Sequence, residues 1–430
     1  MKRLLCVLIT FFLLPHHLCA GGNVNLFTLK NGIEVIHKKA GENPIVTLQI
    51  FLRTGVANED ESKAGLASLV QVMLNKGTKS RSSEQLSNDV ENIGSGISSD
   101  TDSDYSHLGI SVVDSHTEKA FEILSDVVMN PLFDKKELEK ERANALAGIE
   151  RRKDSINNAA NDLLNKSFYG THPYSRITLG TKEGITSITK DDLINWHKKY
   201  FTSNNMFLVI MGNIELTDAK NTAEKYFGNI PASPQEFTVS EPVLPKKQFI
   251  SLPTVKFNQA YLMMAYPAPS INDPDFPALK VINTVLGGRM TSRLFIELRE
   301  KLSLAYEVSS YYPSKKHLSK FVIYLGLKKK NLELTKKRIA EIIEDLKNNK
   351  IDEKELSDTK NYIKGVFLLE HQTINRQAWY LGWWEVTGKG YAYDQQYLDD
   401  LMKVTSEDIQ KAANKYFNRD FVEVELVPEK

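Results

Sequence analysis

Cysteine is scarce in this chain of 430 residues: there are only two, Cys6 and Cys19, and both lie near the N-terminus. Residues 1–20 have the layout of a secretory signal, with two basic residues, an apolar run and a small residue, Ala20, at the end. A chain cleaved after Ala20 keeps no thiol, which excludes disulfides and cysteine catalysis for that product. We therefore expect an exported protein.

Two other interpretations of residues 1–20 remain open, a retained membrane anchor and a lipid attached to Cys19. The apolar run is too short to span a bilayer comfortably. His17 and Leu18 also match poorly the small residues that precede the modified cysteine in bacterial lipoprotein signals. We expect no membrane span once the signal is cleaved.

An excess of charge of one sign is also missing, since 55 basic residues stand against 54 acidic ones. This balance gives no reason to expect a nucleic-acid partner. The chain is 41% hydrophobic and 25% charged, which is typical of a globular protein. A chain of this length is too long for a single hydrophobic core, so we expect two domains or more.

Residues 65–78 are the segment around which the sequence is interpreted. Apolar residues recur there at helical spacing and Gly77 follows the last of them, which predicts an amphipathic helix with a glycine stop. Alternating or apolar runs predict strands, and longer periodic runs predict helices. The predicted strands are 23–29, 33–38, 45–54, 105–113 and 207–211, and the predicted helices are 116–129, 134–153 and 189–201.

The second half of the sequence repeats the first. Residues 134–138 have a counterpart in 352–356, and residues 189–201 have one in 405–417, in the same order and at nearly the same offset. A proline-rich linker at 229–250 separates an N-terminal domain, 21–228, from a C-terminal domain, 251–430. We expect an α+β fold of two homologous domains, each a largely antiparallel sheet packed with helices.

Several segments together resemble one known family. They are residues 53–59, 65–78, 141–142, 172–174, 287–300 and 304–306. Their order and spacing are similar to those of the M16 (pitrilysin-like) zinc peptidases in the short two-domain form, M16B, over nearly the whole chain after the signal. The resemblance implies two domains arranged as a clamshell, and with the signal it points to the periplasm.

The zinc motif of that family, His-x-x-Glu-His, is absent. Ligands at i and i+4 share a helix face and can bind one zinc ion, and the glutamate between them can accept a proton from the bound water. By register, the two histidine positions are Ser68 and Val72, the base position is Gln71, and a distant glutamate position is Gly148. None of the four replacements keeps the chemistry of its position, so we expect no zinc site in this chain.

A second set of family residues is retained. Arg299 and Tyr306 match in spacing and context a pair that faces the zinc in active members and holds the substrate near its scissile carbonyl. If the helix continues to the tyrosine, both project from one face. The alternative is a surface ion pair for Arg299 and simple packing for Tyr306. Gly287 and Gly288 are candidates for a close approach to substrate, or for a helix C-cap.

Other features receive structural interpretations. Glu370 and His371 look like part of the zinc motif but lie in the wrong half, so we expect a chance surface pair. Glu141 is expected to be a solvated charge and His172 a structural hydrogen bonder. An aromatic cluster is expected to pack at the domain interface rather than to contact peptide. Its members are Trp379, Tyr380, Trp383 and Trp384.

The sequence leaves two functions open. In the first, the chain is the non-zinc-binding subunit of a two-chain peptidase. It is inert alone and supplies Arg299 and Tyr306, while a homologous partner with an intact motif supplies zinc and base to hydrolyse peptides or unfolded proteins. In the second, the chain is an inactive peptide-binding or structural scaffold of the same fold, and a homodimer is possible.

Overall fold

The computed structural model describes residues 24–41, 43–235 and 237–429. Residues 1–20, which we interpret as a signal, lie outside these ranges. In the described residues the first half forms a six-stranded sheet, sheet 1, in the order β1-β2-β6-β3-β5-β4, and only the β2–β6 pair is parallel. Its strands are β1 (Val24–Thr28), β2 (Glu34–Lys39), β3 (Ile45–Leu52), β4 (Ser98–Thr101), β5 (Ser106–Val113) and β6 (Met206–Gly212).

The second half forms a five-stranded sheet, sheet 2, in the order β7-β11-β8-β10-β9, again with one parallel pair, β7–β11. Residues 248–250, which we expected in the linker, already belong to β7. Two largely antiparallel sheets with helices confirm the predicted α+β class. The strands are β7 (Gln248–Thr254), β8 (Ala260–Ala268), β9 (Ala305–Tyr311), β10 (Ser319–Leu327) and β11 (Val422–Pro428).

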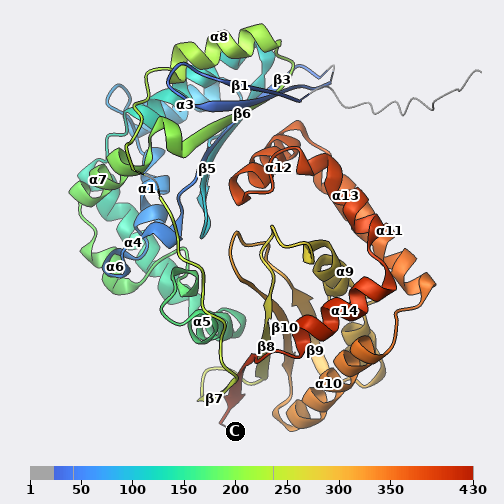
Figure 1. Cartoon of the computed structure of the whole chain (residues 1–430). Helices are drawn as coiled ribbons and strands as arrows, with labels where there is room; N and C mark the ends of the chain where they lie inside the picture. The colour runs from blue at the N-terminus through green and yellow to red at the C-terminus, as the bar shows by residue number, and fades with distance from the viewer. Residues whose placement is uncertain (1–23, 42, 236, 430) are drawn as a thin grey trace, which may run out of the picture.

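Helices cover the outer face of each sheet (Figure 1). The helices around sheet 1 are α1 (Leu66–Leu74), α2 (Ser83–Asn92), α3 (Thr117–Met129), α4 (Lys135–Arg152), α6 (Lys182–Ser187), α7 (Lys190–Tyr200) and α8 (Leu216–Phe227). The helices around sheet 2 are α9 (Phe276–Leu286), α10 (Leu332–Asn348), α11 (Glu353–Glu370), α13 (Tyr393–Lys403) and α14 (Ser406–Phe417).

Capping side chains fix the helix starts that the repeat predicted. Thr189 and Thr405 each accept a hydrogen bond at 3.2 Å from the third helical residue, whose aspartate bonds back to the cap. Asp134 accepts from two backbone amides at the start of α4 in the same way. Each bond satisfies an amide that the helix leaves unpaired.

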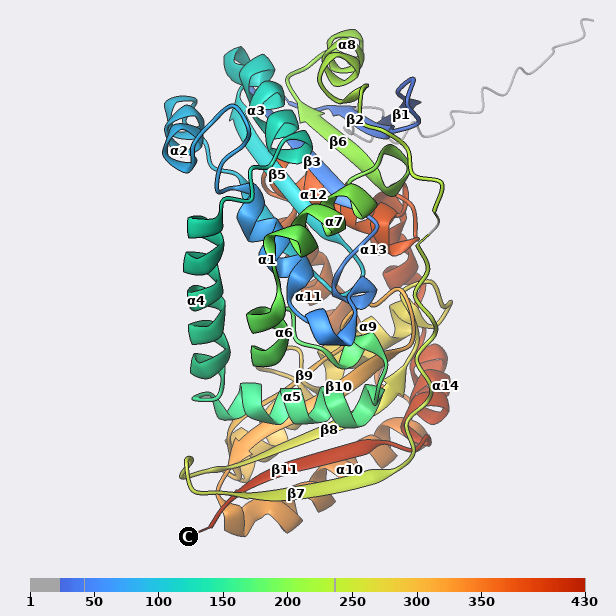
Figure 2. The same cartoon turned by 90° about the vertical axis from the view of Figure 1, so that its left-hand side faces the viewer.

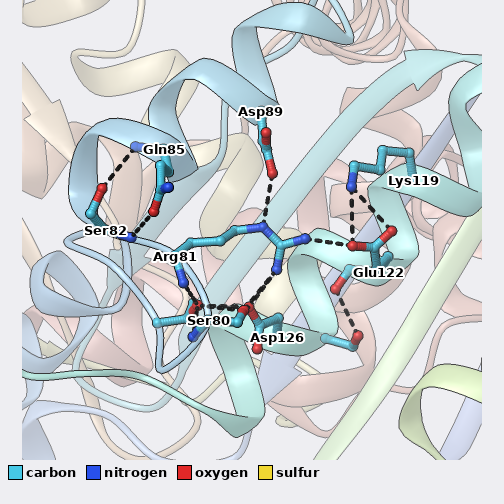
Figure 3. A network of polar contacts seen from close by, with 10 residues as sticks. Ser80, Arg81, Ser82, Gln85, Asp89, Lys119, Glu122 and Asp126 are labelled. Atoms are coloured by element: carbon cyan, nitrogen blue, oxygen red, sulfur yellow. Dashed lines mark hydrogen bonds and ion pairs between the residues drawn. The ribbon is translucent and has the colours of Figure 1, made fainter.

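The polar stretch 79–104, in which the sequence predicted no element, contains α2 and β4. The side chain of Arg81 connects α2 to α3 through Asp89 at 2.9 Å, Asp126 at 2.6 Å and Glu122 (Figure 3). Only two residues of α2 are buried, so its apolar signal is weak. Ion pairs and the hydrogen-bond ladder to β5 hold this region, and neither appears as hydrophobic periodicity.

The two halves exchange one helix each. Helix α5 (Ile156–Tyr169) comes from the first half but packs on the inner face of sheet 2, and α12 (Ile374–Thr387) comes from the second half but packs on the inner face of sheet 1. Helix α12 packs against β3 and β6, and Figures 1 and 2 show α5 across β8. The aromatic cluster follows this exchange. Trp384 is buried in the sheet 2 core and Trp379 packs toward sheet 1, which confirms the interface interpretation.

Candidate functional site

Helix α1, the centre of the predicted site, is anchored by a buried carboxylate. The two oxygens of Glu59 accept hydrogen bonds from the backbone amides of Gly65 at 3.0 Å and Ala67 at 2.7 Å. Burial raises the pKa of Glu59 to about 7, against the opposing effect of those amides and of Arg176. Gly65 has a φ of +105°, and a Cβ there would lie 2.9 Å from the carbonyl oxygen of Leu179. These contacts hold the start of α1 against the loop that contains Glu59 and against Leu179.

Three of the four degenerate zinc-motif positions line one cavity. Ser68 and Val72 on α1 face Gly148 on α4 across a space of about 520 Å³. Gln71 lies on the buried side of α1, where its side-chain oxygen accepts a hydrogen bond from Ser99 of β4 at 2.8 Å. The structure thus brings the two former histidine positions and the distant glutamate position together, and directs the base position toward β4.

The donor set of this cavity does not fit zinc. Ser68 donates its hydroxyl proton to the carbonyl oxygen of Thr178, and neither Val72 nor Gly148 has a side-chain donor atom. Glu141 is the one carboxylate in the lining, and it pairs with Lys76 at 3.0 Å. Among the described residues, no group of three or more His, Cys, Asp and Glu side chains is placed to bind a metal ion.

Glu141 is therefore not a free solvated charge. Its side chain is 11% exposed, and burial disfavours its charge. The hydrogen bonds from Lys76 and Asn144 and the charges of Lys76 and Lys140 together outweigh burial and lower the pKa below its ordinary value. Sequence reasoning also missed Glu59, whose position six residues before the N-cap Gly65 carries no local signal. Its carboxylate can be recognised as a cap only once the loop is folded.

Arg299 and Tyr306 lie on different elements. Residues Phe295–Lys301 form a π-helix that contains Arg299, the chain then turns through Ser303 at φ +50°, and Tyr306 belongs to β9. The π-helix, whose hydrogen bonds span five residues, ends at Lys301. Ser303 then adopts a left-handed conformation, so the helix does not continue to the tyrosine. The shared helix face that the spacing suggested does not form.

Both side chains are available to a ligand. Tyr306 is 54% exposed, and Arg299 is exposed with its guanidinium 4.9 Å from the ring centre of Phe295. Across the described part of the chain, neither side chain makes a hydrogen bond or an ion pair, so the surface ion pair considered for Arg299 does not form.

The glycine pair has a structural explanation. Gly287 is the C-cap of α9, and a Cβ there would lie 2.3 Å from the backbone nitrogen of Ser310 in β9. A Cβ on Gly288 would lie 3.0 Å from the Cα of Thr284. The space beside Gly287 that a substrate strand was expected to occupy is therefore filled by β9 of the chain itself.

The two histidines that sequence reasoning set aside are structural. His371 bridges the carbonyl oxygen of Phe367 at 2.8 Å and Asp394 at 2.9 Å, while Glu370 pairs with Arg376. His172 bonds to the carbonyl oxygen of Ser240 at 2.8 Å through one ring nitrogen. Both imidazoles connect segments of the fold.

The chain belongs to the M16 peptidase family, as its motifs suggested. Residues 34–182 match the family model described as insulinase (peptidase family M16), and residues 187–363 match the model described as the peptidase M16 inactive domain. Together the two models account for most of the chain. None of the helices that the structure describes is both long and apolar enough to cross a membrane.

Relatives extend over almost the full length. The chain is 27% identical over 399 residues to the uncharacterized zinc protease YmxG of Bacillus subtilis, covering 93% of this chain and 97% of that protein. It is 25% identical over 403 residues to an uncharacterized zinc protease of Rickettsia felis, covering 92% and 95%. These names describe the relatives, whereas this chain has no His-x-x-Glu-His sequence.

Solved structures agree on the fold. A peptidase M16 inactive domain from Pseudomonas fluorescens superposes with a TM-score of 0.87 at 26% identity and covers 95% of this chain and 99% of that one. A protease from Helicobacter pylori has the same TM-score at 20% identity and covers 95% and 100%. The similarity in fold therefore extends over both halves of the chain.

Proposed function

We propose that this chain is the non-zinc-binding subunit of a two-chain M16 peptidase. A homologous partner with an intact His-x-x-Glu-His motif supplies zinc, which polarises the scissile carbonyl and activates water. This chain supplies Arg299 and Tyr306. The observation that carries the proposal is the contrast between these two exposed, unpaired side chains and a former zinc cavity whose donors are absent or already paired.

The roles of the two residues follow from their chemistry. The Tyr306 hydroxyl donates a hydrogen bond to a carbonyl oxygen and stabilises the negative charge that develops on it. The Arg299 guanidinium binds neighbouring peptide carbonyls or a carboxylate of the substrate. Because they lie on different elements, the two residues can be positioned independently of each other.

A free sheet edge supports a peptide as the substrate. Strand β4 is the outermost strand of sheet 1 in the described residues, and Ser99 on it bonds to Gln71 of α1. An extended peptide can add to such an edge through main-chain hydrogen bonds. It would then run beside the helix that carries the degenerate motif positions.

The test uses the mature chain alone and together with the partner. We expect no zinc and no turnover of an unstructured peptide by the lone chain, and zinc plus turnover by the pair. Arg299→Ala and Tyr306→Phe should each lower kcat/KM by about 100-fold, as expected for a lost transition-state donor, with the zinc content unchanged.

Two matched variants control for surface changes of the same kind. Lys301→Ala removes a neighbouring charge whose side chain is 66% exposed, and Tyr362→Phe removes an exposed phenol on α11. Both should leave kcat/KM unchanged. Zinc and activity in the lone chain would overturn the proposal, and unaltered kinetics of both site variants would reduce Arg299 and Tyr306 to structural residues.

The second function, an inactive peptide-binding scaffold, is favoured by the same empty donor set. It predicts peptide binding without turnover even in the presence of the partner. Export to the periplasm is also part of the proposal. Residues 1–20 support export, and fractionation of cells that produce the full chain tests it.

A further inference from the structure

Helix α5 presents a row of three asparagines to sheet 2. Asn157, Asn161 and Asn165 are spaced by four residues and therefore share one helix face. Asn157 bonds to the Tyr261 hydroxyl, and Asn161 accepts from the Tyr311 hydroxyl at 2.9 Å. Asn165 accepts from the ammonium of Lys320. The three asparagines thus add polar groups to a contact between α5 and sheet 2 that is otherwise apolar.

A cavity of about 380 Å³ lies against this row. Its lining includes the three asparagines, four tyrosines and three cationic side chains, Arg176, Lys315 and Lys320. Among the described residues that line it there is no aspartate or glutamate. The cavity is thus polar and has positive charge on its walls.

Within the described residues, Lys315 is the one of the three cations that forms an ion pair, although the charge of Arg176 also acts on the Glu59 carboxylate. Lys315 pairs with Asp102 at 2.6 Å. In contrast, within the described ranges Lys320 bonds only to a neutral asparagine, and Arg176 bonds to the backbone carbonyl oxygen of Glu59. Asp162, whose charge reaches Lys320, already pairs with Arg152 at 2.7 Å.

Lys320 is unusual because it is 5% exposed. Burial, together with the nearby charge of Lys315, lowers the pKa of Lys320 to about 7. A buried ammonium without a counter-ion is unfavourable, and an anion placed beside it removes that cost. The Nδ2 groups of Asn161 and Asn165 make no other hydrogen bond in the part of the chain that the structure describes, so they are free neutral donors.

We propose that this cavity is a binding site for a carboxylate, held by Lys320, Arg176 and the amide groups of Asn161 and Asn165. A guanidinium and planar amides match the flat geometry of a carboxylate. The carboxylate comes either from the C-terminus of a peptide or from a small free acid. The site is separate from the cavity around α1 and does not depend on a zinc-bearing partner.

Calorimetry on the purified full chain at pH 7.5 tests the proposal with three probes. They are N-acetyl-trialanine with a free C-terminal carboxylate, the same peptide as its C-terminal amide, and succinate. We expect the acid peptide or succinate to bind and the amide to bind at least tenfold more weakly. Tighter binding of the peptide than of succinate identifies a chain terminus as the ligand, and the reverse order identifies a free acid. No binding of either carboxylate, or equal binding of the amide, would overturn the proposal.

Variants locate the binding in the cavity. Lys320→Met should weaken binding about tenfold to hundredfold, as expected for losing a charged hydrogen bond. Lys320→Arg keeps the charge and should retain most of the affinity. Lys354→Met removes a lysine whose side chain is 85% exposed on α11, and it should change nothing. Unchanged affinity of a folded Lys320→Met protein would contradict the assignment.

A measurement on the unaltered protein covers the case in which Lys320→Met does not fold. A bound carboxylate raises the pKa of Lys320, so binding at pH 7.5 should take up part of a proton. Titration in two buffers with different ionisation enthalpies measures that uptake. Binding without proton uptake would place the anion elsewhere and sink the proposal.

Discussion

The two exchanged helices occupy equivalent places and have opposite character. Helix α12 closes on sheet 1 with Gly382 against the ring of Phe51, and its one asparagine in the contact, Asn375, accepts from Gln49 at 2.6 Å. Helix α5 meets sheet 2 through three asparagines and leaves a cavity beside the buried cation of Lys320. The α12 joint also adjoins a cavity, of about 360 Å³, but Asp102 and Asp104 line it together with its cations, whereas among the described residues no carboxylate lines the cavity at the α5 joint.

This difference separates structure from ligand binding within one architecture. Both helices hold the two halves together, because each brings residues of one half into the core of the other. The two joints differ in the charge around their cavities, which aspartates partly balance at α12 and which no carboxylate balances among the described lining residues at α5. Substitutions at the α12 joint should therefore act on stability, and substitutions at the α5 joint should act on charge, pH dependence and binding.

The largest expected effect is Gly382→Ala at the α12 joint. A Cβ there would lie 2.0 Å from an atom of the Phe51 ring, which is fully buried and stacked on Phe207 at 5.4 Å. The ring has no free space to move into, so we expect a loss of about 3 kcal/mol in the free energy of unfolding. Urea denaturation followed by circular dichroism measures it.

The control for this change is Gly365→Ala on α11. A Cβ at Gly365 has no atom within 4 Å, and alanine is the better helix former. We expect a gain of about 0.5–1 kcal/mol. If Gly382→Ala and Gly365→Ala change the free energy of unfolding by the same amount, close packing of α12 on sheet 1 does not stabilise this joint.

A smaller effect, at the α5 joint, is the pH dependence of stability. The pKa of Lys320 is about 7 in the fold and 10.5 in the unfolded chain, so the unfolded state binds more protons between these values. Stability should therefore rise with pH across that window, by about 1 kcal/mol per pH unit. Lys320→Met removes this contribution, so its profile should be flatter by that slope between pH 7.5 and 9.5.

Denaturant midpoints at each pH measure the stability of both proteins. Taking the difference between the two cancels the contribution of other titrating groups, such as Lys280. That lysine is also buried, with a pKa lowered to about 8. Parallel profiles would mean that Lys320 keeps an ordinary pKa. Lys354→Met, on an exposed face, should follow the unaltered protein throughout.

Local chemistry made much of the fold predictable. Helix α1 was predicted from its apolar periodicity, and the repeated segments that begin at Asp134, Thr189 and Thr405 marked the starts of α4, α7 and α14, which these residues cap. Each of these signals acts within a few residues, so it is already present in the sequence. The repeat of these signatures correctly suggested two related halves.

The joints were not predictable because they are made by residues distant in sequence. Lys320 stands at the start of the apolar run 321–325 and gives no sign that it is buried, whereas in the fold it bonds to Asn165 of α5 and is 5% exposed. The spacing of Asn157, Asn161 and Asn165 was the one available signal, since polar residues on a single face of a helix indicate a polar contact. Arg299 and Tyr306 were identified by motif, but the π-helix and turn between them depend on packing against β9.

The smallest expected effect is at the α12 joint, where Asn375→Ala removes a hydrogen-bond acceptor. Its side-chain oxygen lies 2.6 Å from Gln49, 3.0 Å from Ser111 and 3.2 Å from Thr47. Gln49 and Thr47 are buried but still bond to each other at 2.9 Å, so we expect a loss of only about 1 kcal/mol in the free energy of unfolding.

The control is Gln372→Ala, a change at an exposed residue just before α12, which should stay within about 0.5 kcal/mol of the unaltered protein. If the Asn375→Ala profile stays parallel to that of the unaltered protein across pH 7.5–9.5, the Gln49–Asn375 contact involves no titrating group. A pH-dependent loss would mean that this contact is coupled to a titrating group, as at the α5 joint, and would remove the distinction between the two joints.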